Sequence, residues 1–414
     1  MEKAVSSFKQ LPESAKIQLI SLAILVGLIY CFSNPAPQAH YDYTFRVADN
    51  MLRGSVAFDE RPPSWLNEFV PFEGHYYSVF PLGSVVTMAP FALLKLIGMI
   101  KEMPAALIIG LTASGICLFL LLIGLRYDIS PWKQVLLVMG MLFGTWMWTN
   151  TTMGGAWQLA LAFAMLGELG AIYFSVYNRK PFLAGLFFAL AFGNRTEILL
   201  TAPIFMYLLL RRDPDEPDDV HAPDRKLQIY TLAKFCIVPF ILGVCTLVYN
   251  YIRFHSFTDF GYARIPGVLA EPWYNHGIFS LYYIPGQAYE MLLKPWEFLD
   301  RYPPLRPNPF SSSILWSSPF LLFVLRFGSK DKVLKYLSWA AIVVLTFVLW
   351  MHGNSGGWQF GYRYAMVLLP WIFVILMESA PKKITLLEWA AYIFSFAANL
   401  YATWLFHWTT YLKP

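Results

Sequence analysis

The residues best suited to chemistry in this sequence are carboxylates in a polar stretch that follows the first apolar run. Asp42 comes soon after that run, and Asp49, Asp59 and Glu60 come later in the same stretch. A carboxylate held close to the end of a rigid helix can act as a general base toward a hydroxyl group. We favour Asp42 for this role, because Asp49 could cap a helix or face solvent and Asp59 and Glu60 precede a Pro-Pro turn.

Two arginines in later polar turns are candidates for holding an anion. Arg195 lies in GNRTE between two apolar runs that are each too short for a full span, and Arg363 lies in GNSGGWQFGYRY after a long apolar run. Half-length helices that meet at a polar turn are typical of a water-filled cavity. Arginine can hold a phosphate through two parallel hydrogen bonds. The alternatives are an ion pair of Arg195 with Glu197 and an Arg363 that reaches the lipid headgroups.

A second long polar segment, residues 251–311, is rich in proline, tyrosine and tryptophan. It contains Arg253, His255 and Tyr262. Flat rings beside cations are what a groove for a carbohydrate or a lipid phosphate would need, and we include Arg253 among the candidate phosphate ligands. The same aromatic residues could instead be the belt that membrane proteins place at the interface. Both interpretations stay open on the sequence alone.

The composition requires that these residues be positioned by helices in a bilayer. The chain of 414 residues is 57% hydrophobic and only 14% charged, with a mean hydropathy of +0.48. Its net charge of +5 comes from short lysine and arginine clusters between apolar runs, which is the pattern of cytoplasmic loops and not of a nucleic-acid-binding surface. The four cysteines all lie in apolar runs, so we expect neither a disulfide nor a metal site there.

The apolar runs predict an all-α polytopic membrane protein with about eleven spans. Lysines before the first run and few after it place the N-terminus in the cytoplasm. We expect residues 83–100, which contain Pro90 and Lys95, to lie at the outer face without crossing, because a full span there would invert the later basic clusters. The expected spans are 17–32, 104–125, 134–150, 157–177, 181–193, 197–210, 229–250, 312–327, 333–351, 364–379 and 386–406.

These spans predict one membrane domain over residues 1–414. Its parts outside the bilayer are a first outer loop at 34–103 that contains helices along the membrane surface, a cytoplasmic linker at 211–228 and a second outer loop at 251–311. The linker is rich in proline and aspartate and is expected to be solvated.

Several motifs, in this order, resemble those of the GT-C superfamily of polytopic glycosyltransferases. They are Asp42 followed by ADNMLRG, then GHYYSVFPLG, NRTE, YNYIRFHSFTDFGY and GWQFGYRYAMVLLP. The similarity is greatest to the bacterial branch that includes relatives of the protein O-mannosyltransferases and the aminoarabinose transferase of lipid A. It extends over nearly the whole chain.

The resemblance implies a GT-C fold in the bacterial cytoplasmic membrane with its active site on the periplasmic face. The implied reaction moves a sugar from a polyprenyl-phosphate donor to a hydroxyl of an envelope glycan, lipid or protein, with inversion. Asp42 would be the general base, and Arg363 and Arg195 would contact the donor phosphate. The expected cavity residues are Tyr76, Tyr77, Ser78, His255, Tyr262 and Tyr362.

No cofactor is expected for this reaction. Many relatives have an adjacent Asp-Glu pair at the first position, whereas Tyr43 follows Asp42 here. Some relatives also place an acidic residue on the second outer loop, and the corresponding stretch TTMGGAWQ contains none. A divalent metal remains an alternative.

Two other functions remain open. A transporter or flippase of lipid-linked sugars would also need a cavity and cations, but the sequence shows no internal repeat, and Glu168 is its one clear ionisable residue deep in a helix. A non-catalytic assembly subunit with a degenerate site is the third alternative.

Overall fold

The computed structural model describes residues 12–211 and 224–412, and these are mostly helical. Among them, five helices are long and apolar enough to cross a membrane. This agrees with an all-α membrane protein, although five is fewer than the eleven spans expected. The five are α1 (Glu13–Phe32), α4 (Ala105–Gly124), α7 (Ala156–Ile172) with its π-helical extension Tyr173–Tyr177, α10 (Arg225–Phe254) and α13 (Lys332–Met351).

Most of the remaining apolar runs form shorter or interrupted helices, whereas α15 is a continuous helix of 23 residues. The run expected at 134–150 ends as a helix at Phe143, and a separate short helix begins at Met147. Near Pro319, the run expected at 312–327 gives only one α-helical turn followed by a 3-10 helix. The elements are α5 (Pro131–Phe143), α6 (Met147–Met153), α8 (Pro181–Asn194), α9 (Ala202–Leu210), α12 (Ile314–Ser317), α14 (Leu369–Glu378) and α15 (Leu386–Trp408).

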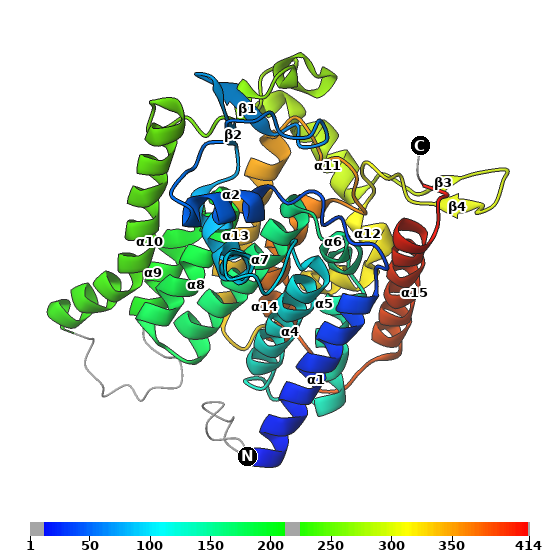
Figure 1. Ribbon diagram of the computed structural model, residues 1–414. Coiled ribbons are helices and arrows are strands. Elements are labelled where there is room, and N and C mark those ends of the chain that lie inside the picture. Colours follow the sequence, from blue (N-terminus) through cyan, green and yellow to red (C-terminus); the bar gives the residue numbers. More distant parts are fainter. Residues whose placement is uncertain (1–11, 212–223, 413–414) are drawn as a thin grey trace.

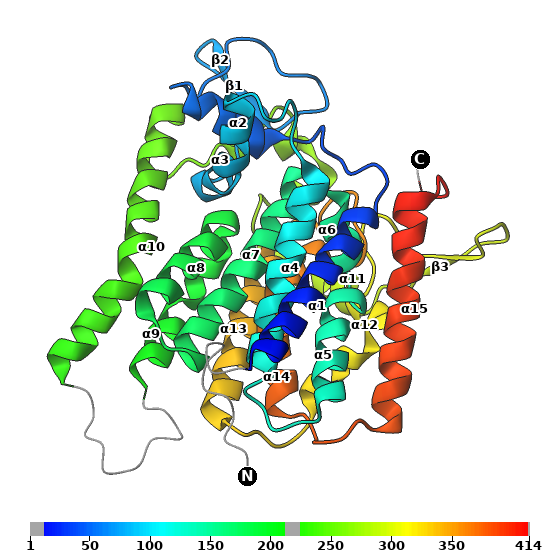
Figure 2. The same cartoon turned by 60° about the horizontal axis from the view of Figure 1, so that its bottom comes forward.

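The segment between α1 and α4 has its own small structure, which lies across one end of the helices (Figures 1 and 2). It consists of α2 (Tyr43–Leu52), the antiparallel hairpin β1 (Phe69–Phe72) and β2 (His75–Ser78), and α3 (Leu82–Leu96). An ion pair of 2.9 Å between Lys95 and Asp49 joins α3 to α2. The run expected at 83–100 is therefore a helix that begins at Leu82 and packs against α2.

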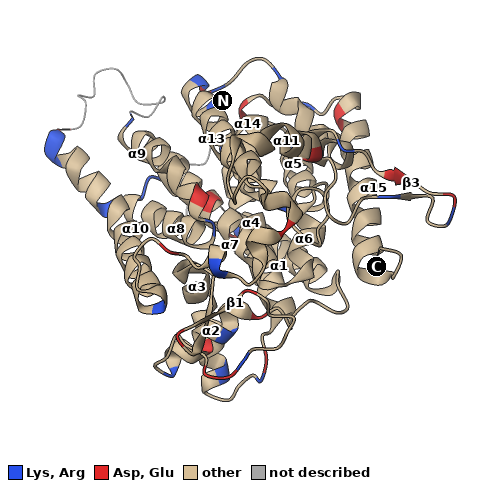
Figure 3. Ribbon diagram, turned by 90° about the horizontal axis from the view of Figure 1, so that it is seen from above, with Lys and Arg blue, Asp and Glu red and all other residues tan. Residues whose placement is uncertain are grey.

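The second polar segment reaches the same end of the molecule (Figure 1). It contains short 3-10 turns, the helix α11 (Ile284–Leu292) and a hairpin of β3 (Glu297–Phe298) with β4 (Leu305–Arg306). The last turn of α15 also points to this end, whereas α1 begins at the opposite end (Figure 1). Charged residues lie mainly in the connections and at helix ends (Figure 3).

A glycine contact joins α3 to the end of α8. A Cβ atom on Gly83 would lie 2.3 Å from Cα of Gly193, so only glycine allows the two backbones to approach this closely. Beside this contact, the amide of Asn194 donates to Oγ1 of Thr87 at 2.9 Å. The contact fixes the first polar segment directly beside Arg195, which follows α8.

A buried ion pair joins α5 to α15. Nζ of Lys133 lies 2.8 Å from Oε1 of Glu388, and each side chain is only 1% exposed. Arg326 adds a second cation, 2.6 Å from the same oxygen. Glu388 also completes a capping box with Thr385 at the start of α15. The buried carboxylate is thus fully paired, as a charge removed from water must be.

Candidate functional site

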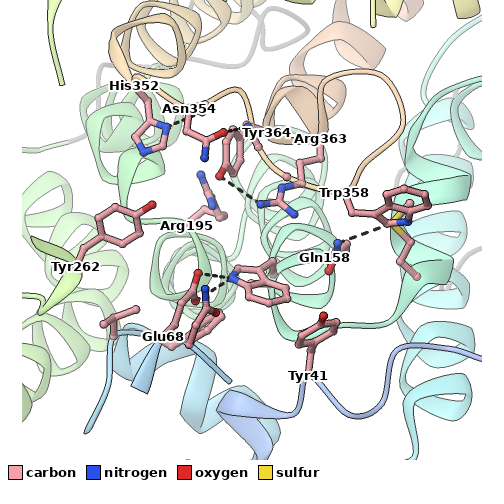
Figure 4. A pocket seen from close by; sticks show the side chains of 18 of the residues that line it. Tyr41, Glu68, Gln158, Arg195, Tyr262, His352, Asn354, Trp358, Arg363 and Tyr364 are labelled. Carbon is pink, nitrogen blue, oxygen red and sulfur yellow. Dashed lines mark hydrogen bonds between the residues drawn. The ribbon is translucent and has the colours of Figure 1, made fainter. Parts of the chain in front are cut away.

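A cavity of about 1270 Å³ lies where the two polar segments meet the ends of α7 and α8. Its walls come from residues 34–41 and 64–68, from the first turn of α7, from the turn after α8 and from residues 260–279 and 352–364. Segments far apart in the sequence therefore form one site. Figure 4 shows the side chains that line it.

Glu68 is a carboxylate of this cavity that an indole holds through both of its oxygens, whereas Glu271, also in the lining, accepts from Trp273 through one. Nε1 of Trp157 donates to both carboxylate oxygens, each at 2.8 Å. Burial raises the pKa of Glu68 to about 7, against the opposing effects of the Trp157 hydrogen bond and the Arg363 charge. A carboxylate with a pKa near neutrality can both accept and release a proton at physiological pH, which suits a general base.

Arg363 faces the same cavity and is only 8% exposed. Its backbone N–H donates to the side-chain oxygen of Gln359 at 2.8 Å, which fixes the turn. The guanidinium has one weak contact, 3.4 Å to the hydroxyl of Tyr364, and its Nε has no hydrogen-bond partner. Within the described residues, no carboxylate lies at ion-pair distance from Arg363. Its unused N–H donors can therefore receive an anion.

Arg195 also lines the cavity, but it is already paired. Its Nη2 and Nε lie 2.7 and 2.8 Å from Oε1 of Glu197, so the local ion pair considered from the sequence is present. The ring of Tyr364 lies between the two arginines, with its centroid 4.8 Å from the guanidinium of Arg195 and 5.2 Å from that of Arg363. The two cations thus belong to one cluster.

Tyr262 and His352 close the same side of the cavity (Figure 4). The hydroxyl of Tyr262 lies 2.8 Å from that of Tyr274. Nδ1 of His352 donates to the backbone oxygen of Asn354 at 2.7 Å. Burial lowers the pKa of His352 to about 4, so the imidazole is neutral at pH 7 and adds no charge to the two arginines.

Asp42 lies beside the cavity and is paired with a neighbour on α2. It occupies the N-cap position of α2, and its oxygens receive hydrogen bonds of 3.0 and 3.1 Å from Arg46. Burial raises the pKa of Asp42, with Arg46 acting in the opposite direction. The preceding residue, Tyr41, lines the cavity, whereas Asp42 is not among its described lining residues. Its role as the general base remains a prediction.

Arg253 is fully buried and bonds to the chain itself. It donates to the backbone oxygen of Ser78 and, at 2.6 Å, to Oδ1 of Asn250. These bonds fasten the end of α10 to the end of β2. Neither Arg253 nor Ser78 is among the described residues that line the cavity.

The other predicted cavity residues have partners of their own. Tyr76 pairs with Pro71 across the β1–β2 hairpin, and Tyr77 packs in a small apolar cluster beside it. His255 lies 3.0 Å from Glu73. The hydroxyl of Tyr362 donates to Oε1 of Gln287 at 2.7 Å. The cavity lining among the described residues includes Arg363, Arg195 and Tyr262 but not these four.

The sequence reasoning missed Glu68 and Trp157, which come from segments far apart in the chain. A carboxylate directly before a short aromatic strand was the available signal for Glu68. Its elevated pKa depends on tertiary burial, which no local pattern reveals. In the part of the chain that the structure describes, no group of three or more His, Cys, Asp or Glu could hold a metal ion. Metal independence therefore remains a prediction.

Comparison with known proteins gives no neighbour: no protein-family model, curated protein or solved structure matches this chain. The resemblance to the GT-C superfamily consequently rests on the sequence motifs alone.

Proposed function

We propose that the protein is a GT-C-type glycosyltransferase that moves a sugar from a polyprenyl-phosphate donor to an acceptor hydroxyl, with inversion. It would work at the periplasmic face of the bacterial cytoplasmic membrane, with about eleven spans and a cytoplasmic N-terminus. The observation that carries the proposal is one cavity with both a carboxylate, Glu68, and a buried arginine, Arg363, that has no carboxylate partner among the described residues. A base and an anion site are the two groups that this transfer needs.

The arrangement of the polar segments supports the membrane orientation. Both long polar segments and the last turn of α15 lie at one end, and α1 begins at the other (Figure 1). A lipid-linked donor is available at the membrane surface, so a cavity at that end could receive its phosphate without removing the lipid chain from the bilayer.

Each step has a residue that fits it. Arg363 would hold the donor phosphate and stabilise the negative charge that it gains as the bond to the sugar breaks. Glu68 would take the proton of the acceptor hydroxyl as the hydroxyl oxygen attacks the anomeric carbon of the donor sugar. Attack from the face opposite the phosphate inverts the anomeric centre. Asp42 is the rival base, because it follows α1 in the family-like motif, but its oxygens are held by Arg46.

The proposal is tested by sugar transfer in proteoliposomes that contain a radiolabelled polyprenyl-phosphate sugar and an envelope extract as acceptor. Glu68→Gln should reduce transfer by about 100-fold or more, because general-base catalysis contributes roughly that factor. Donor binding should be retained. Asp42→Asn is the matched comparison, and we expect it to keep most of the activity.

The opposite ranking of these two variants would identify Asp42 as the base. Absence of transfer from the wild-type protein with every donor in a panel would contradict the glycosyltransferase. In that event, movement of the labelled lipid between leaflets of the same proteoliposomes would support a flippase, and no movement would support an assembly subunit.

A further inference from the structure

The cavity has two chemically different sides, and the proposed function explains only one of them. Arg195, Tyr262 and His352 lie on one side in Figure 4, whereas Tyr41, Gln158 and Trp358 lie on the other, with Arg363 beside Trp358. Tyr41, Gln158 and Trp358 are all uncharged. We define the neutral wall as the lining residues Gln38, Tyr41, Trp65, Gln158 and Trp358.

The neutral wall is built around a glycine. A Cβ atom on Gly155 would lie 2.9 Å from Oε1 of Gln158 and 3.5 Å from both Oε1 of Gln38 and Cβ of Tyr41. Backbone hydrogen bonds hold the turn at residues 38–41 in this position. They run from Gln38 N–H to the oxygen of Met153 at 2.7 Å and from Ala156 N–H to the oxygen of Tyr41 at 3.0 Å. Two amides and a ring therefore converge without a bulky side chain between them.

Gln158 has an unused hydrogen-bond acceptor. The residue is 2% exposed, and its Oε1 has no hydrogen-bond partner in the described structure. Its Nε2 has only a weak contact, 3.8 Å to the sulfur of Met153. A buried amide oxygen without a partner costs free energy unless a ligand or water donates to it. Because Gln158 lines the cavity, a ligand hydroxyl can fill this role.

Large rings complete the wall. Trp65 is 52% exposed although it lines the cavity, and the ring of Trp358 is supported by Phe406 at a centroid distance of 5.4 Å. Tyr41 packs on Trp157, 5.0 Å between centroids. Rings of this kind offer flat apolar area that can cover a ligand while neighbouring amides bond to its polar rim.

We propose that the neutral wall binds a neutral carbohydrate, which is the acceptor of the transferred sugar. A sugar ring presents a face of C–H groups to an aromatic ring and a rim of hydroxyls to amides. A phosphorylated headgroup would need a cation, and the one beside the wall, Arg363, is assigned to the donor phosphate in the proposed function. A peptide would need partners for its backbone groups. The role of the bound carbohydrate as acceptor rests on the proposed function. Binding of the carbohydrate to the wall does not.

The test measures binding without a donor. Neutral pentose and hexose trisaccharides, a Ser/Thr-rich peptide and a phosphorylated glucosamine disaccharide are each added to the full-length protein in nanodiscs, and saturation-transfer NMR reports binding. We expect a neutral trisaccharide to bind most tightly. Trp358→Leu and Gln158→Leu should each weaken its binding by about fivefold or more. Trp132→Leu is the matched control, because Trp132 is 80% exposed and lies outside the cavity.

Tighter binding of the peptide or of the phosphorylated disaccharide would overturn the proposal. So would trisaccharide binding that is the same in the wild type and in both wall variants, or no binding of any probe. Trisaccharide binding that depends on the wall, in a protein that transfers no sugar, would keep this inference and remove the proposed function. The two can therefore fail separately.

Discussion

The pairing of Glu68 with Trp157 gives the candidate base a defined protonation behaviour. Burial raises the pKa of the carboxyl, whereas the two indole hydrogen bonds favour the ionised form. A base works only when ionised, so transfer should increase as the pH rises through about 7, the pKa of Glu68. Trp157 thus acts as a positioning residue through Glu68.

Trp157→Phe should move this increase to higher pH. The substitution keeps most of the ring but removes the N–H that stabilises the carboxylate. A hydrogen bond to a charged group contributes about 1.5 kcal/mol or more, which corresponds to about one pH unit. A pH profile of transfer measures the shift, and Trp132→Phe should leave the midpoint in place. An unchanged midpoint in Trp157→Phe would show that Glu68 does not set the profile.

Arg363 offers a second prediction at the level of one side chain. Arg363→Ala should weaken binding of a polyprenyl phosphate by about tenfold or more, because charge-assisted hydrogen bonds are lost. Arg363→Lys should weaken it less, since the charge remains but the planar fork does not. Equilibrium binding to the labelled lipid measures both. Arg306→Ala is the control, because Arg306 pairs with Glu297 on the β3–β4 hairpin. Equally small effects of both substitutions would leave Arg363 without a role in the site.

At the level of elements, the contact of α3 with α8 determines where the first polar segment lies over the cavity. Gly83 and Gly193 meet backbone to backbone, and Arg195 follows α8 by one residue. A change in the spacing of these helices therefore alters both stability and the arginine cluster.

Gly83→Val should lower the stability by about 1–3 kcal/mol, the usual cost of overpacking. The added side chain has no free space, because its Cβ would lie 2.3–2.5 Å from backbone atoms of Gly193. Gly243→Val in α10 is the matched control, because no atom lies within 4 Å of its Cβ position. Thermal unfolding in detergent compares the two variants. A melting temperature for Gly83→Val as high as that of the control would show that α3 can move away from α8 without loss.

The sequence predicted the uninterrupted helices well and the broken ones poorly. The expected run 333–351 and the helix α13 (Lys332–Met351) differ by one residue at one end, because apolar residues continue until the polar turn at His352. In contrast, the expected helix 134–150 breaks at Gly144, and Pro319 begins a 3-10 helix where a span was expected. Hydropathy detects apolar residues but not the backbone breaks that packing permits.

On the scale of the whole molecule, both polar segments and the last turn of α15 lie at one end, and α1 begins at the other (Figure 1). The proposed orientation predicts that α4 crosses the bilayer and that α3 does not. Glu102, before α4, and Asp128, after it, are both exposed, so they can report the two sides.

Glu102→Cys and Asp128→Cys should react with an impermeant thiol reagent from opposite sides of the membrane. Glu102→Cys should be labelled in intact cells, and Asp128→Cys only after the membrane is opened. The four native cysteines are replaced by serine in the background protein, which provides the unlabelled control. Labelling of both positions from the same side would contradict the proposed topology.

The site was only partly predictable from the sequence, because the whole fold decides which buried residues reach the cavity. Arg195 and Arg363 were noticeable because cations are rare in apolar surroundings, and the structure brings both to the cavity. Arg253 was expected to bind phosphate because it lies among aromatic residues, yet it fastens α10 to β2. A cation in an apolar stretch needs a partner. The sequence does not show whether that partner is a bound ligand or another residue of the protein.

The buried pair of Lys133 and Glu388 has a consequence for biogenesis. Translation produces Lys133 long before Glu388, so α5 enters its environment with an ammonium group whose principal anion does not yet exist. The charge of Lys133 is neutralised only when α15 packs against α5. Before α15 packs, Lys133 lacks both the carboxylate of Glu388 and the cover that these C-terminal residues provide. Packing of α15 against α5 is thereby coupled to neutralisation of the charge on Lys133.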